Sequence, residues 1–274
     1  MTPRQTPSLL DRVTGHLPGP LRAAVEQSQG HDVLLFAAAL GFYALVSVAP
    51  LVIFVLWLMG IVAGDTKVQR LAEEIRRIAP PNLGADKALR RVAELGTQLS
   101  LPAAIGALWP ATSYGAGLKR AFERLSSGKD KQAKGLRGRA LAVFLLLPLL
   151  VLGALVSSYL GAAIVGESGL ARIAGIVLGL LAGYVGAGVA TALIYRIFPR
   201  ESLSWRAIAR GTAVTAAGVS VLSLAFSVYL VLGADFKEHY ASSGLAGIVL
   251  LAVWLFLANA LLLVGYLVAR ESMR

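Results

Sequence analysis

The sequence predicts an all-α, polytopic transmembrane helix bundle of about six spanning helices, because the chain is strongly apolar, sparsely charged and divided into uncharged runs of spanning length. Of its 274 residues 57% are hydrophobic and 15% are charged, and the mean hydropathy is +0.70. This composition is far too apolar for an ordinary soluble domain. A spanning helix takes about 20 apolar residues, so the chain has room for about six crossings. We therefore expect one membrane domain.

The apolar runs begin after a polar N-terminal tail. The first run, 34–63, is uncharged. It would measure about 45 Å as a helix, which exceeds the ~30 Å hydrocarbon core, so we expect it to tilt or to bend at Pro50. The run 101–118 is weaker because Pro102 and Pro110 interrupt it, and it is either a complete crossing or a broken helix. We expect a tail over 1–33, a membrane domain over 34–270 and a C-terminus over 271–274, with spans at 34–63, 101–118, 140–165, 170–194, 208–232 and 244–269.

Residues 66–98 separate the first two predicted spans and are polar but periodic. Apolar residues follow helical spacing on both sides of Pro80 and Pro81, as at Leu71, Ile75 and Ile78. The pattern predicts two amphipathic helices outside the hydrocarbon. They either lie on the membrane face or pack on each other as solvated helices.

Positive charge is distributed unequally between the two sides of a six-span model. The chain has 26 Lys and Arg residues and a formal net charge of +11. With the N-terminus inside, 17 of these residues fall on the cytoplasmic side and 9 on the other, in agreement with the positive-inside rule. A five-span model without a crossing at 101–118 also satisfies the rule. The two models differ over residues 1–33 and 64–100.

Small residues on the span 170–194 predict close helix packing. Glycine recurs there every fourth residue, at Gly175, Gly179 and Gly183. The preceding span carries a matching small face at Gly153, Ser157 and Gly161. We expect the two spans to pack as an antiparallel pair, and the alternative use of the glycine stripe is a homo-oligomer interface.

Hydroxyl and amide groups, rather than charges, occupy the interior of the predicted spans. No Asp, Glu, Lys or Arg lies in the middle of any span, which disfavours a transporter with a proton relay. The polar residues suit interhelical hydrogen bonds, and they equally suit a weakly polar cavity for an amphiphilic molecule. The candidate cavity residues are Tyr43, Ser47, Trp109, Ser113, Tyr195 and Asn259.

Basic residues gather in the predicted cytoplasmic loops 119–139 and 196–210. Topology signalling alone explains such a cluster, and attraction to anionic headgroups would add about 1 kcal/mol per residue near the surface. The candidate headgroup contacts are Lys119, Arg120, Arg196 and Arg206. Membrane lipids are thus the expected partners, and no nucleic-acid partner is expected.

No pattern in the sequence predicts catalysis or metal binding. The chain has no cysteine, and the six-span model places His239 on the opposite side of the membrane from His16 and His31. Walker A, Ser-His-Asp and metal-spaced acidic patterns are missing from the sequence. We expect no metal, no cofactor and no enzymatic activity.

Three segments resemble the YihY/BrkB family of inner-membrane proteins, formerly labelled ribonuclease BN. The resemblance is carried by Tyr43, Ser47 and Pro50 in an Ala-rich first helix, by Tyr195, Pro199, Trp205 and Gly211 at the fourth-to-fifth helix junction, and by Tyr240, Gly244, Trp254 and Gly265 in the last helix. The chain departs from the family's common Gly-Ala-Glu-Leu ending, where it has Arg270 and Glu271.

The resemblance implies six helices in a bacterial inner membrane, with both termini in the cytoplasm and a role connected with envelope lipids. Combined with the interior hydroxyls and the basic loops, it predicts a transporter or flippase-like binder of an amphiphilic, lipidic substrate, with anionic lipid as the first candidate. The alternative is a non-transporting membrane scaffold of envelope assembly. Ribonuclease activity is not expected, because no metal or acid-base pattern supports it.

Overall fold

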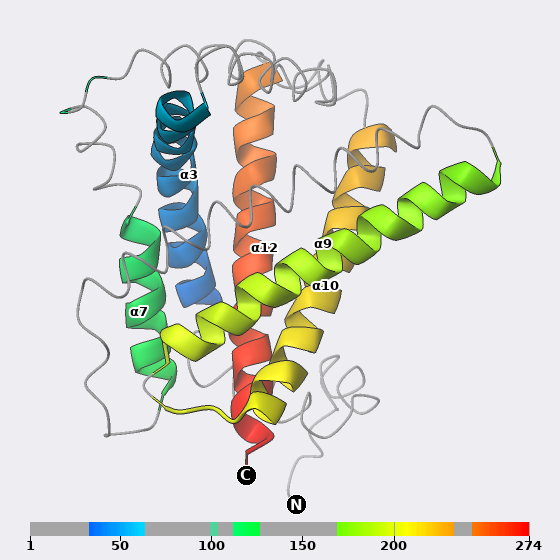
Figure 1. Cartoon of the computed structure of the whole chain (residues 1–274). Coiled ribbons are helices and arrows are strands. Elements are labelled where there is room, and N and C mark those ends of the chain that lie inside the picture. The colour runs from blue at the N-terminus through cyan, green and yellow to red at the C-terminus, as the bar shows by residue number, and fades with distance from the viewer. Residues whose placement is uncertain are drawn as a thin grey trace, which may run out of the picture.

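The described part of the chain is helical. The computed structural model describes residues 33–63, 112–126, 169–199, 201–232 and 243–273, with the isolated positions 100 and 102. Its helices are α3 (Val33–Ala63), α7 (Ser113–Leu125), α9 (Leu170–Ile197), α10 (Trp205–Leu232) and α12 (Ser243–Glu271) (Figure 1). The all-α class is thereby confirmed. The predicted span 140–165 and the predicted helices of 66–98 lie outside the described residues.

Three stretches of the described helices are long and apolar enough to cross a membrane: Val177–Ile197, Trp205–Phe226 and Ile248–Glu271. The described start of α3, Val33–Ser47, is a shorter apolar helix, and α3 itself continues through Pro50 to Ala63. Apolar side chains such as Val177 and Leu181 are more than half exposed on α9. Lipid is the solvent that suits such a surface, because hydrocarbon surrounds these side chains without the cost of contact with water. The chain is therefore an integral membrane protein with several apolar helices.

Helix α7 differs from the expected element in this region. The predicted span 101–118 overlaps it only from Ser113 onward, and the helix continues to Leu125 through residues assigned to a cytoplasmic loop. Its buried residues recur at helical spacing, at Gly117, Leu118, Ala121, Phe122 and Leu125. The helix is amphipathic, so its polar face conceals it from a search for apolar runs.

The helix α12 occupies the centre of the described bundle. It packs against α10 on one side and α3 on the other; α7 lies on α3, and α9 crosses α10 obliquely (Figure 1). Helices α10 and α12 are antiparallel, because the contacts advance along α10 as they go back along α12: Gly211 meets Gly265, and Gly218 meets Leu261. The N-terminus of α3 and the C-terminus of α12 lie at the same end, called here the lower end as it appears in Figure 1.

The closest helix contact is the crossing of α10 and α12 at two glycines. A Cβ atom built on Gly265 would overlap the Thr215 hydroxyl and lie 2.8 Å from the carbonyl oxygen of Gly211. One built on Gly211 would overlap the carbonyl oxygen of Gly265 and lie 2.7 Å from Cβ of Ala269. Small residues allow the backbones of membrane helices to approach this closely.

One glycine of the predicted stripe, Gly183, has no packing partner among the described residues. A Cβ atom built on Gly183 meets no described atom within 4 Å. The surroundings of Gly175 are not described, and Gly153, Ser157 and Gly161 lie outside the described residues. Helix α9 instead approaches α10 through Gly188, where an added Cβ would lie 3.7 Å from Cγ2 of Thr212. The pairing of the span 140–165 with α9 stays a prediction.

Candidate functional site

A cavity of about 170 Å³ lies between the five described helices, and each helix contributes to its wall. Small side chains make this space, because alanines face one another from α3, α9 and α12. The lining residues are Ala44, Ser47, Tyr114, Ala187, Ala190, Thr191, Ile194, Thr215, Val219, Trp254, Leu255, Ala258, Asn259 and Leu262. None of these described lining residues is charged, so they provide no ionic partner for a charged group.

One side of the cavity is held by hydrogen bonds that join α3, α7 and α12. The Ser47 hydroxyl shares a hydrogen bond of 2.9 Å with the Ser113 hydroxyl and accepts a longer one from the Tyr114 backbone N–H. The Tyr114 hydroxyl donates to Oδ1 of Asn259 at 2.8 Å. The amide nitrogen of Asn259 donates to the Leu255 carbonyl one turn earlier at 2.8 Å. These bonds fix the amide orientation and tie three helices together.

The lower side of the cavity is held by a second set of hydrogen bonds around Tyr195. Its hydroxyl is 2.8 Å from the Thr215 hydroxyl and donates to the Leu262 carbonyl at 2.6 Å. The Thr215 hydroxyl, with its single hydrogen, also lies 3.3 Å from the Leu261 carbonyl, which is an alternative acceptor to the Tyr195 oxygen. The Tyr195 side chain is buried beside the crossing of Gly211 and Gly265, where it joins α9 to both crossing helices.

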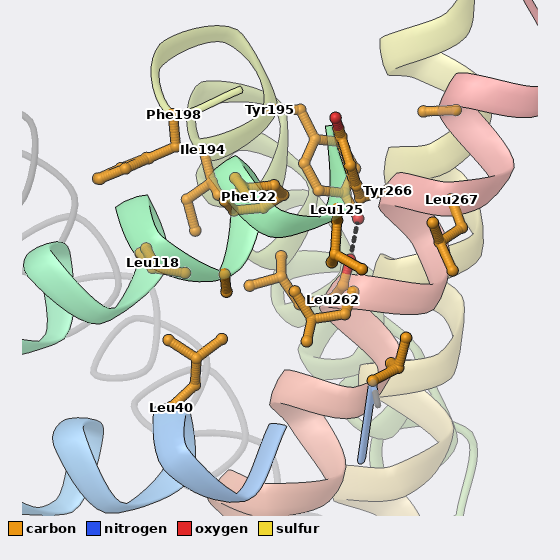
Figure 2. Packing of buried hydrophobic residues seen from close by; sticks show 14 of the residues in the cluster. Leu40, Leu118, Phe122, Leu125, Ile194, Tyr195, Phe198, Leu262, Tyr266 and Leu267 are labelled. Atoms are coloured by element: carbon orange, nitrogen blue, oxygen red, sulfur yellow. Dashed lines mark hydrogen bonds between the residues drawn. The ribbon is translucent and has the colours of Figure 1, made fainter. Parts of the chain in front are cut away.

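Four aromatic rings, including that of Tyr195, fill the lower end of the bundle. Phe122 stacks on Phe198 and meets the edge of Tyr266 at a centroid distance of 4.8 Å (Figure 2). The Tyr195 ring lies 6.0 Å from that of Tyr266. All four side chains are buried. Offset and edge-to-face pairs of this kind add about 0.5–1.5 kcal/mol each beyond burial, so the cluster closes the bundle between the cavity and the lower end.

A buried arginine fastens the same end. The side chain of Arg270 is 6% exposed, and its Nη1 donates to the Leu125 carbonyl at 2.7 Å. Its Nε lies 3.5 Å from the Glu201 carboxylate. A cation at the C-terminus of α7 interacts favourably with the unsatisfied carbonyls there. Arg270 thus links α12 to the end of α7 and to the segment between α9 and α10.

The comparison with known protein families matches residues 24–274 to the family described as Virulence factor BrkB. This match covers almost the whole chain. The chain belongs to the BrkB family. No curated protein and no solved structure gives a significant match. The YihY/BrkB resemblance drawn from the sequence is confirmed, and the glycines and tyrosine that carried it, Gly211, Gly265 and Tyr195, meet at one point of this BrkB protein.

The structure brings together some of the sequence-predicted cavity residues of the BrkB protein. Ser47 and Asn259 line the cavity, whereas Ser113 and Tyr195 lie behind it and bond to lining residues. Tyr43 instead packs its ring against α7 near Gly117, and Trp109 lies outside the described residues. The lining residues that the sequence did not assign to the site include Thr215 and Trp254. A signal for Thr215 is its place one turn after Gly211, on the same face of α10.

The four predicted headgroup contacts lie on three helices. Arg120, Arg196 and Arg206 are exposed, and Lys119 is partly exposed. The Arg196 guanidinium lies 5.2 Å from the ring centre of Trp205, which is 67% exposed. Lys119 pairs with Glu123 one turn later at 3.7 Å. Aromatic and basic side chains of this kind are typical of a helix end at the membrane interface.

Proposed function

We propose that this BrkB protein binds an amphiphilic membrane lipid and moves it in the manner of a flippase. The observation that carries the proposal is the cavity that five helices line with uncharged, weakly polar side chains. A lipid chain or another apolar group has to leave the bilayer only partly to occupy such a space. The closed lower end, with its aromatic cluster and Arg270, is then one state of a bundle that opens for transport.

The proposed headgroup site comprises Lys119, Arg120, Arg196 and Arg206, at the interface of the inner membrane with the cytoplasm. Exposed basic side chains attract anionic headgroups, and Arg196 and Arg206 flank an interfacial tryptophan. The charge distribution supports a cytoplasmic location for these residues and for both termini. The same proposal assigns the protein no enzymatic activity and no nucleic-acid partner.

The test is equilibrium binding of the purified, full-length protein to vesicles of defined charge. We expect anionic lipid to bind more tightly than zwitterionic lipid, and we expect added salt to remove the difference because exposed charges are screened over ~8 Å at physiological ionic strength. Replacing the four basic residues with Gln should weaken anionic-lipid binding by about fivefold per residue at low salt, since ~1 kcal/mol is lost at each position.

A charge-matched control separates this site from a general effect of net charge. The variant with Gln at Lys129, Lys131, Lys134 and Arg137 also loses four positive charges, from a different part of the sequence. It should retain most of the binding. Equal losses in the two variants would contradict a specific headgroup site. Binding that ignores lipid charge would favour the scaffold function, and cleavage of RNA by the stringently purified protein would contradict the non-enzymatic assignment.

A further inference from the structure

The cavity has fewer available polar atoms than its lining suggests. Of the six described lining residues with polar side-chain atoms, four use them in hydrogen bonds to other residues: Ser47, Tyr114, Thr215 and Asn259. Thr191 and Trp254 supply the remaining hydroxyl and indole N–H. A phosphate or sugar that entered would exchange its hydration for few partners, and burial of polar groups without partners is costly. The chemistry of the wall therefore favours hydrocarbon.

The size of the cavity limits the hydrocarbon to part of one chain. An apolar protein cavity of about 150 Å³ stays dry and binds benzene, which has six carbons. A cavity of about 170 Å³ accordingly takes a similar length of hydrocarbon. The volume therefore corresponds to part of one acyl chain.

The depth of the cavity matches the position of chain ends in a bilayer. Trp205 begins α10, and its exposed ring beside Arg196 marks the interface. Thr215 lines the cavity ten residues further along the same helix, roughly 15 Å away at the α-helical rise. This distance is half of the ~30 Å hydrocarbon core, so the cavity lies near the bilayer midplane.

We infer that the cavity binds the terminal hydrocarbon segment of a single lipid acyl chain, while the headgroup stays at the interface. The inference rests on the proposed function and specifies it further, because it assigns the cavity to the chain and leaves the basic residues for the headgroup. The hydroxyl and amide network then serves to shape the cavity and to join the helices. It does not contact the headgroup.

Trp254 provides a direct probe, because it lines the cavity and the chain has only four tryptophans. When Trp57, Trp109 and Trp205 are replaced with Phe, Trp254 is the single remaining source of tryptophan fluorescence. The protein is reconstituted in vesicles whose lipids carry bromine, a short-range quencher, at either the distal or the proximal carbons of one chain. We expect distal bromine to quench Trp254 more strongly than proximal bromine, in zwitterionic and in anionic vesicles alike.

Filling the cavity should remove this quenching. Ala258→Leu and Ala187→Leu add a branched side chain to the cavity from two different helices, and each should lose most of the distal quenching. Ala217→Leu is the matched control, since Ala217 is exposed on α10, and it should be quenched like the parent. Stronger quenching by proximal bromine in the parent, or unchanged quenching in a folded filled variant, would overturn the inference. Either result leaves the charge-selective binding of the proposed function to be judged by its own assay.

Discussion

Replacing Gly265 with alanine is expected to lower the free energy of unfolding by about 2–3 kcal/mol relative to replacing Gly188 with alanine. At Gly265 the new methyl group overlaps the Thr215 hydroxyl and lies 2.7 Å from the Tyr195 hydroxyl, with the Gly211 carbonyl on its third side. The carbonyl belongs to a helix backbone and cannot rotate away, so α10 and α12 have to separate. Separation also breaks the hydrogen bonds of Tyr195 that close the cavity from below.

The comparison with Gly188 isolates packing from helix propensity. Alanine is favoured over glycine inside a helix by about 1 kcal/mol at both positions. At Gly188 the added Cβ makes ordinary contacts, 3.7 Å from Thr212 and 3.9 Å from Ala216. Equilibrium unfolding in mixed micelles measures both variants. Equal stabilities for the two would contradict the close crossing of α10 and α12.

Replacing Arg270 with methionine is expected to lower the free energy of unfolding by about 2 kcal/mol, the usual magnitude for a hydrogen bond from a charged group. The change leaves the Leu125 carbonyl at the end of α7 without this donor, and it removes the cation next to the Glu201 carboxylate. Methionine keeps most of the buried apolar stem, so the loss reports the guanidinium. Because Glu201 is 19% exposed, water offsets part of the cost of its separation from Arg270.

Two further variants identify the source of this loss. Glu201→Gln should lower the free energy of unfolding by less in the Arg270→Met background than in the parent protein, because the two side chains interact. Arg124→Met, at an exposed position on α7, should change stability by less than about 0.5 kcal/mol. If Arg270→Met behaved like Arg124→Met in thermal unfolding, the lower end would not depend on Arg270.

The long apolar helices were predictable because a spanning helix appears in the sequence as a long uncharged run. The expected span 170–194 corresponds to α9, Leu170–Ile197, and the span 244–269 corresponds to α12, Ser243–Glu271. The ends differ by a few residues because Tyr195 and Arg270 look like loop residues in a hydropathy profile. Both are buried in the bundle, where each has hydrogen-bond partners.

The contacts of the site were less predictable than the helices. The sequence places Ser47 and Asn259 inside predicted spans, but it does not show that Tyr114 bonds to Asn259 across 145 positions of sequence. It also does not show that most of these polar groups are committed to hydrogen bonds within the bundle, which is the observation behind the inferred hydrocarbon occupant. Helix α7 escaped prediction because prolines precede it and charges cover one face.

Movement of lipid between leaflets is the measurement that tests the central claim most directly. The purified protein is reconstituted into vesicles containing a fluorescent anionic lipid, and an impermeant reagent added outside removes the fluorescence of the outer leaflet. With protein and without a proton gradient, we predict that the inner-leaflet lipid also becomes accessible, faster than in protein-free vesicles and faster than for a zwitterionic analogue. The account would be contradicted if, for every lipid, the inner-leaflet fluorescence were lost no faster than in protein-free vesicles. A membrane scaffold would then be the better description of the function.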